Sequence, residues 1–388
     1  MQLINAKIYT MCEGIIDLGY ITISDEKIID VGEMSSYNSD GTNVYDAGGC
    51  PVLPGLIDGH CHLGMFGDSL GFEGDDGNEA TDPLTPHLRA IDAINAMDRC
   101  FSDALDAGIT AVVTGPGSAN PIAGMSAVIK THGVCIDDMI IKAPAAMKFA
   151  LGENPKTVYH GKNQTPETRM ATSALIRDML RKAKKYMLDV DKAANSSDDD
   201  EIDPPEYDAK CEALIPLLRR DMKAHFHAHR SDDIFTAQRI AREFEIDFAL
   251  VHCTEGHLIA DKVAQSNSCV FVGPNLCDRA KPELSNLDIT TAAVLHKAGV
   301  DVAIVTDHPV IPIQYLTICA ALAVKGGLDE YEALRAITIN PARIMGLGDR
   351  VGAIAVGMDA DIAVYDGNPL EIQTKIKKVI VNGQIVRG

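Results

Sequence analysis

Two histidines that stand one residue apart, at the end of an apolar run, constrain this chain more than any other feature. The segment PVLPGLI, residues 51–57, predicts a buried strand, interrupted at Pro54 and Gly55, that leads into His60 and His62. Side chains alternate across a strand, so both imidazoles point to one side and Cys61 points to the other. Two imidazoles on one face can bind one divalent metal ion, such as zinc, nickel or iron.

Four later segments repeat this arrangement, because each places titratable residues at or near the end of an apolar run. They are MKAHFHAHRSDDI with His225, His227 and His229, FALVHCTEGH with His252, VAIVTDHP with Asp307, and AAMKFALGENPK with Lys148 and Glu153. The C-terminal ends of the strands are where the active sites of (β/α)8 barrels are built. We therefore predict that these residues meet at one mouth of a barrel, around a shared metal site.

The two ends of the chain differ from its middle. The middle alternates strand-like and helical segments, which predicts a parallel sheet long enough for eight βα units. Residues 1 to about 54 and the last ~40 residues contain short strands joined by turns, such as Asn382-Gly383. The predicted fold is α/β, a (β/α)8 TIM-like barrel at residues 55–347, with a small β-sandwich domain formed by residues 1–54 and 348–388.

Helix signals divide the middle further. Thr85-Pro86 predicts the start of a helix that runs to Gly108, and Thr165-Pro166 predicts a long helix to about Leu188. The following stretch, residues 189–208, is acidic and poor in apolar residues, which predicts an exposed loop.

In combination, these motifs resemble those of the amidohydrolase superfamily, in particular its imidazolonepropionase-like and prolidase-like members. The resemblance covers nearly all of the chain and rests on PGLIDGHCHLG, GPGSANPIAG, KFALGENPK, HAHRSDDI, LVHCTEGH, IVTDHPV and GDRVGAIAVGMDADIAVYDG. It implies one or two divalent metal ions, with zinc as the expected metal. The ligands that it implies are His60, His62, His227, His252 and Asp307.

The resemblance also implies an acidic group that bridges two metal ions. This group is either a carbamylated Lys148 or the carboxylate of Glu153. Alternation turns the two side chains opposite ways in a regular strand, so only one is expected to point inward. Glu153 is slightly preferred, because a carboxylate is a hard oxygen ligand that needs no modification.

Further roles are assigned around the predicted metal site. Asp307 is expected to take a proton from water and pass it to the leaving nitrogen, and His229 to contact the substrate or stabilise an oxyanion. His225 lies deeper in its strand and is expected to be a core residue. Arg279 and Lys281 are candidate cations for a substrate carboxylate. Other substrate-binding candidates follow predicted strands, and they are Glu73, Asn120, Arg230, His257 and His308.

The predicted reaction is hydrolysis of a C–N bond in a small molecule, either a cyclic amide or a dipeptide-like substrate, by metal-activated water. A deaminase is the alternative, because the same water can attack an amidine carbon. A non-catalytic barrel scaffold is disfavoured, since all five implied ligands are present.

Bulk properties limit the partners. A formal net charge of −20 argues against nucleic acids and anionic membrane surfaces. We find no apolar stretch of ~20 residues and no signal-peptide pattern, so we expect a cytoplasmic protein. Ten cysteines without a CxxC pair do not predict a disulfide scaffold. A small-molecule substrate and a homo-oligomer are expected.

Overall fold

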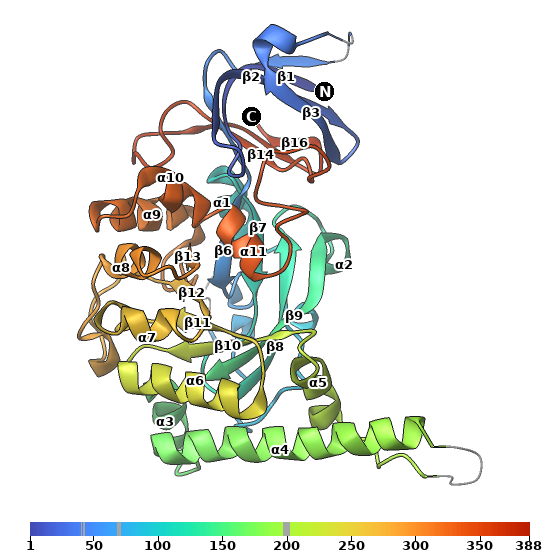
Figure 1. Ribbon diagram of the computed structural model, residues 1–388, viewed down its shortest axis with the longest axis vertical. Coiled ribbons are helices and arrows are strands. Elements are labelled where there is room, and N and C mark those ends of the chain that lie inside the picture. The colour runs from blue at the N-terminus through green and yellow to red at the C-terminus, as the bar shows by residue number, and fades with distance from the viewer. Residues whose placement is uncertain (40, 42, 68–70, 197–201) are drawn as a thin grey trace.

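The polypeptide is organised around two eight-stranded sheets. The computed structural model describes residues 1–39, 41, 43–67, 71–196 and 202–388 (Figure 1). One sheet forms the barrel in the order β13-β12-β11-β10-β9-β8-β7-β6, and the other combines strands from both ends of the chain.

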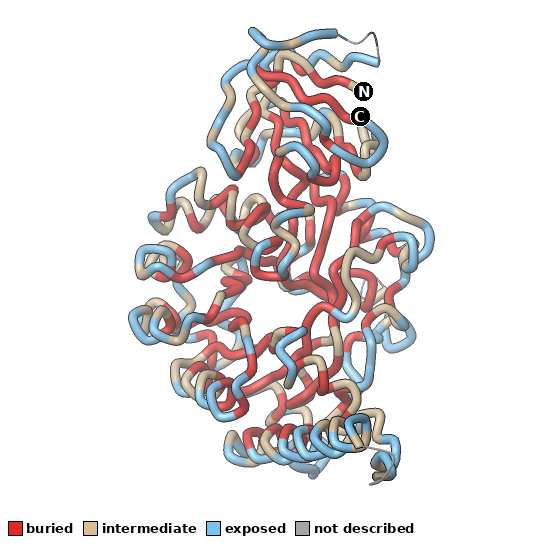
Figure 2. Tube along the Cα trace, turned by 45° about the vertical axis from the view of Figure 1, so that its right-hand side comes forward, coloured by how far each residue is buried: buried red, intermediate tan, exposed pale blue. Residues whose placement is uncertain are grey.

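The barrel strands are short and almost entirely buried. Figure 2 shows them as the buried interior of the larger part of the molecule, with exposed residues on the surrounding helices. The strands are β6 (Leu56–Cys61), β7 (Ile109–Thr114), β8 (Ile122–Lys130), β9 (Ile140–Ala150), β10 (Lys223–Ala228), β11 (Phe248–His252), β12 (Cys269–Val272) and β13 (Val302–Ile304). Continuous apolar runs are typical of parallel strands that are covered on both faces.

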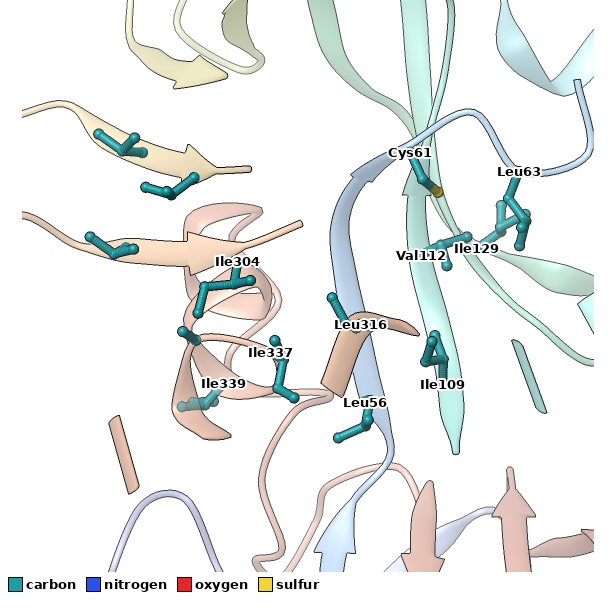
Figure 3. Close-up of a cluster of buried hydrophobic side chains, with 14 of the residues drawn as sticks. Leu56, Cys61, Leu63, Ile109, Val112, Ile129, Ile304, Leu316, Ile337 and Ile339 are labelled. Carbon is teal, nitrogen blue, oxygen red and sulfur yellow. The ribbon is translucent and has the colours of Figure 1, made fainter. Parts of the chain in front are cut away.

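The barrel is nearly closed at the seam between β13 and β6. The backbone N–H of Asp307 donates to the carbonyl of His60 at 3.2 Å, and the N–H of His62 donates to the carbonyl of His308 at 2.8 Å. Buried apolar side chains of β6, β7 and β13, such as Leu56, Ile109 and Ile304, belong to one core cluster (Figure 3). The segments after β6 and β13 are therefore held together at the mouth of the barrel.

One strand departs from the predicted (β/α)8 pattern. β8 runs antiparallel to both β7 and β9, whereas the other neighbouring pairs of the barrel are parallel. A parallel pair needs a crossover of a dozen or more residues, usually a helix. The segment between β7 and β8 holds only residues 115–121, and the four-residue α2 (Ile136–Met139) lies between β8 and β9.

The helices lie outside the barrel, and α6 to α10 form a column beside β10 to β13 (Figure 1). Besides α2 they are α1 (Arg99–Asp106), α3 (Glu153–His160), α4 (Arg169–Ala194), α5 (Ala209–Leu218), α6 (Ser231–Phe244), α7 (Ala260–Ala264), α8 (Thr291–Lys297), α9 (Leu316–Lys325), α10 (Glu330–Arg335) and α11 (Ile339–Ile344). No helix among the described residues is long and apolar enough to cross a membrane.

Two helix predictions were wrong in extent. The segment after Thr85-Pro86 has a short 3-10 turn at Ala90–Asp92, and its α-helix starts only at Arg99, where Asp98 caps the amide of Cys100. Helix α4 continues into the predicted acidic loop as far as Ala194. Residues 197–201 of that loop lie outside the described residues.

The chain ends form one continuous sheet where a small β-sandwich was predicted. Its order is β16-β15-β14-β5-β1-β2-β3, with β4 paired to β1. Its strands are β1 (Gln2–Tyr9), β2 (Ile15–Ser24), β3 (Lys27–Glu33), β4 (Val44–Asp46), β5 (Pro51–Pro54), β14 (Ile362–Tyr365), β15 (Ile376–Val381) and β16 (Gln384–Arg387).

Two features join this sheet to the barrel. Gly55 alone separates β5 from β6, and a Cβ at this position would overlap the side chain of Thr110. Close to this junction, the buried ammonium of Lys130 on β8 lies 2.9 Å from a carboxylate oxygen of Asp359 and also contacts Asp361. The first barrel strand is therefore fixed in place by the end sheet.

Candidate metal centre

The mouth of the barrel holds two adjacent clusters of metal-ligating side chains. The first cluster combines His60 and His62, at the end of β6, with Asp307, which follows β13. The Nε2 atoms of His60 and His62 lie 3.4 Å and 3.3 Å from Asp307 Oδ1. All three side chains are largely buried.

The second cluster combines His227 and His229 from the end of β10 with His252 from the end of β11. The ring centroids of His227 and His252 are 4.5 Å apart, and those of His229 and His252 are 4.4 Å apart. The two clusters adjoin, since the rings of His60 and His252 are separated by 5.8 Å. The structure thus brings together all the predicted histidine ligands and Asp307, with His229 among them.

Backbone groups orient two of these rings. The Nδ1 atoms of His62 and His252 lie 2.7 Å from the carbonyls of Gly115 and Gly273. A carbonyl can only accept, so Nδ1 must carry the proton and Nε2 is left with a free lone pair. This is the usual arrangement that fixes the tautomer of a metal-binding histidine.

The backbone at two of the candidate ligands is strained. His252 and Asp307 have φ angles of 74° and 55°, in the left-handed region that residues other than glycine rarely adopt. Strain of this kind costs roughly 1–3 kcal/mol per residue and is concentrated at functional sites.

The electrostatics favour the metal-binding forms of these side chains. Burial lowers the pKa of His227, His229 and His60 well below the ordinary value, and lowers that of His252 to about 4. Burial alone would raise the pKa of Asp307, but the surrounding imidazoles of His252, His60 and His62 hold it well below its usual range. Neutral imidazoles facing a carboxylate are suitable ligands for a divalent ion.

His227 provides the clearest evidence for a missing partner. It is 2% exposed, and neither Nδ1 nor Nε2 has a hydrogen-bond partner within the described part of the chain. A buried polar group left unpaired costs about 1–3 kcal/mol. A metal ion bound to one of the two His227 nitrogens would satisfy it, so the residues of the two clusters fit a divalent metal ion.

The structure places Lys148, and not the preferred Glu153, inside the site. Lys148 Nζ lies 2.9 Å from His60 Nε2, and burial, opposed by Asp307, lowers its pKa to about 8. Glu153 instead begins helix α3, where its backbone N–H donates to Glu283. The strand pattern ends before Glu153, because Gly152 adopts a φ of 81° and redirects the chain.

Comparison with known proteins identifies the family of this chain. The model of the family described as "Amidohydrolase family" matches residues 52–386. The chain belongs to the amidohydrolase family. Membership indicates a hydrolase of C–N bonds that uses a divalent metal.

Three known proteins illustrate the range of this amidohydrolase's relatives. It is 29% identical to amidohydrolase tasK of Hapsidospora irregularis over 95% of this chain, but it spans only 39% of the length of that protein. It is 24% identical to an imidazolonepropionase of Sphingopyxis alaskensis, over 96% of this chain and 93% of the relative. A crystal structure of an amidohydrolase from Thermotoga maritima MSB8 is 40% identical, with a TM-score of 0.95 over 100% of this chain and 99% of the other.

A cavity of about 260 Å³ opens onto both clusters of the amidohydrolase. His62, His227, His229 and Asp307 line one part of it. The remaining lining is partly apolar and partly polar, and includes Phe66, Leu284, Val310, Ser118, Asn154 and Lys281. A small molecule in this cavity would lie against the candidate metal ligands.

The structure gives Asn120 a structural role in place of the predicted substrate contact. Its amide donates to the carbonyl of Glu79 at 2.7 Å and to the hydroxyl of Thr85 at 2.9 Å, and its carbonyl accepts from Tyr159 at 2.7 Å. These bonds use both amide protons, so we assign Asn120 to holding the surrounding loops together.

The other predicted substrate-binding residues lie around the site without lining the cavity. Arg230 precedes α6 and forms a bidentate pair with Asp232, and Glu73 is exposed on a 3-10 turn. His257 hydrogen-bonds to Thr291, while the imidazole of His308 accepts the N–H of Ile313. The core position predicted for His225 agrees with its burial against Phe271.

One buried side chain at this site was missed. Glu283, in the segment between β12 and α8, is 1% exposed and lies 3.5 Å from His229 Nε2. The sequence segment GPNLCDRAKPE carries Glu283 together with Arg279 and Lys281, but only the two cations were given a candidate role.

Proposed function

We propose that this amidohydrolase opens a cyclic amide, or cleaves a dipeptide-like C–N bond, in a small neutral or weakly charged substrate. The observation that carries the proposal is the buried imidazole of His227, a member of the second cluster, whose two nitrogens have no hydrogen-bond partner among the described residues. The imidazolonepropionase that covers nearly the whole chain supports the cyclic amide class.

The ligand residues have distinct tasks in this proposal. A divalent metal ion, for which zinc is our choice, would activate water and polarise the scissile carbonyl. His60, His62, Asp307, His227 and His252 would hold one or two such ions. Lys148 is our candidate for the bridging position, because its amine lies 2.9 Å from His60 and its lowered pKa favours reaction with CO₂ to form a carbamate.

Asp307 is the proposed proton carrier. Its carboxylate faces the cavity, so it can accept the proton of the attacking water and deliver it to the leaving nitrogen. His229 lines the same cavity, where its Nε2 can donate to a developing oxyanion if it is not a metal ligand.

The pocket favours the cyclic amide over the dipeptide. Its volume of about 260 Å³ lies just below the ~300–1,000 Å³ of pockets for drug-sized ligands, which favours a small substrate. Two of the three candidate cations are already paired, Arg230 with Asp232 at 2.8 Å and Lys281 with Glu283 at 2.7 Å. The third, Arg279, donates to the carbonyl of Leu287 at 3.1 Å. Recognition is therefore proposed to depend on the amide, with less weight on a substrate carboxylate.

A substrate panel tests this proposal. Metal-loaded protein would be assayed with five- and six-membered cyclic amides and imides, with Xaa-Pro dipeptides and with cyclic amidines, and products would be identified by mass. Addition of one water without release of ammonia supports ring opening, whereas ammonia release would replace the proposal by the deaminase alternative. Metal-stripped protein is the control, and equal turnover without metal would reject the mechanism. Self-association, the remaining expectation, is tested by sedimentation of the same preparation.

A further inference from the structure

Glu283 is a buried carboxylate at the second cluster that the proposed mechanism does not use. It lies on a 3-10 turn, Pro282–Leu284, in the long segment between β12 and α8. Its Oε2 accepts the backbone N–H of Glu153 at 3.0 Å, and its Oε1 forms an ion pair with Lys281 at 2.7 Å. Two separate segments thus fix this carboxylate in one orientation.

The distances from Glu283 to the imidazoles are those expected between ligands of one ion. Oε1 lies 3.5 Å from His229 Nε2 and 3.8 Å from His227 Nε2. Ligand atoms at ~2.0–2.2 Å from a tetrahedral zinc ion are about 3.4 Å apart. In the first cluster, Asp307 Oδ1 faces His60 and His62 at 3.4 Å and 3.3 Å. Each cluster therefore has a carboxylate that faces a pair of imidazoles.

The backbone around Glu283 is shaped to accommodate it. Gly152 lies so close that a Cβ there would sit 2.8 Å from Glu283 Oε2 and 3.0 Å from Asp233 Oδ2. The positive φ of Gly152 also suits glycine. A larger residue at this position would push the carboxylate away from the imidazoles.

A simple ion pair with Lys281 does not account for this placement. The side chain of Lys281 is 28% exposed and also donates to Asn154 at 2.8 Å, whereas Glu283 is 1% exposed. A carboxylate whose role was only to pair with Lys281 could form that ion pair at the solvent-exposed surface. Instead, it is buried against His227, whose two nitrogens have no hydrogen-bond partner among the described residues.

We propose that Glu283 is a metal ligand, and that with His227, His229 and His252 it completes a position for one divalent ion. The loop after β12 thereby contributes to the metal centre directly. This rests on the proposed function only in that both require a divalent ion at the barrel mouth. His229 becomes a ligand under this proposal, and the oxyanion role passes to the ion itself.

Cobalt titration tests this proposal without any substrate. Metal-stripped protein would be titrated with Co²⁺, with the visible absorption of the bound ion and native mass spectrometry as readouts. The variants are Glu283→Ala and the isosteric Glu283→Gln. Glu255→Gln is the matched control, because its carboxylate instead accepts the Ser231 N–H and the Asn286 amide.

The expected result is a selective loss at one ion. Removing an outer partner of a ligand weakens metal binding by roughly 10–100-fold. If both Glu283 variants bind one ion more weakly than this range, and if the cobalt spectrum changes, direct ligation by Glu283 is supported. A loss of roughly 100-fold or less in the folded Gln variant, or an unchanged spectrum, overturns it.

The outcomes also separate this proposal from the proposed function. If Glu283→Ala does not fold, as judged by circular dichroism, the Gln variant alone decides. If the wild-type protein binds a single ion, the same comparison applies to that ion. If fully metal-loaded wild-type protein hydrolyses no compound of the substrate panel, this result counts against the proposed function. The role of Glu283 is then still decided by the cobalt titration of its variants.

Discussion

The buried ion pairs of Lys130 offer a quantitative test of how the two sheets are joined. Lys130 and its partners Asp359 and Asp361 are 3% to 4% exposed. Lys130→Met retains most of the aliphatic stem but removes the charge. The two carboxylates then remain in a buried position without that cation, and such a change typically costs about 3–5 kcal/mol.

The remaining contacts place the expected cost at the lower end. Asp359 keeps Lys27 at 2.7 Å and Arg350 at 3.2 Å, and Asp361 keeps the N–H of Asn382 at 2.9 Å. We expect a loss of about 3 kcal/mol. Since the unfolding entropy is about 2.1 cal/mol/K per residue, this loss corresponds to a decrease of roughly 4 °C in Tm for a chain of 388 residues.

Thermal unfolding followed by circular dichroism measures this shift. Lys27→Met is the matched control, because Lys27 pairs with the same Asp359 but its side chain is 47% exposed. An exposed pair contributes about 0–1 kcal/mol, so the control should melt within about 1 °C of the wild type. If Lys130→Met melts as high as Lys27→Met, the buried ion pairs do not stabilise the junction and the reasoning is refuted.

Three further predictions concern the barrel mouth. Asp307→Asn should retain its folded structure but lose ~10²–10⁴ in turnover, the usual contribution of a positioned general base, and near-normal turnover would remove Asp307 from proton transfer. Metal analysis of purified variants should show that His227→Ala and His252→Ala lose bound metal, whereas His87→Ala, which belongs to neither cluster, keeps it. Full metal content in His227→Ala would contradict the ligand assignment. Burial lowers the pKa of His225 to about 3, so the unfolded chain binds a proton below about pH 6.5 while the native protein does not, and stability falls as the pH drops from 6.5 toward 3. In metal-stripped protein, His225→Leu should make that decline shallower by up to about 1.4 kcal/mol per pH unit, as measured by urea unfolding at several pH values, and an unchanged slope would show that His225 does not contribute.

Local patterns predicted which side chains meet at the barrel mouth where a candidate ligand lies at the end of a buried strand. His227 is the penultimate residue of β10 and His252 ends β11, and alternation indicates which way their rings point. The direction of β8 was not predictable in this way, because an apolar run looks the same in parallel and antiparallel strands. Only the short segment at residues 115–121 indicated that no helical crossover could fit.

Residues beyond the strand ends were harder to place. The choice between Lys148 and Glu153 depended on alternation, which fails once Gly152 turns the chain. Glu283 comes eleven residues after the end of β12, so neither periodicity nor motif spacing relates it to His229. Asn120 was assigned to the substrate because it is polar and near a strand, yet its bonds to Thr85 and Tyr159 are long-range contacts that no local pattern contains.

The pairing of β5 with β14 has a consequence for synthesis of the protein. β5 leads through Gly55 directly into β6, but its neighbour β14 begins at Ile362 and is translated only after the whole barrel. A growing chain therefore carries β5 with one edge unpaired while the barrel is translated, and an open edge is a site for association with other chains. A product that terminates before β14 would be an aggregation hazard for the cell rather than a shorter hydrolase.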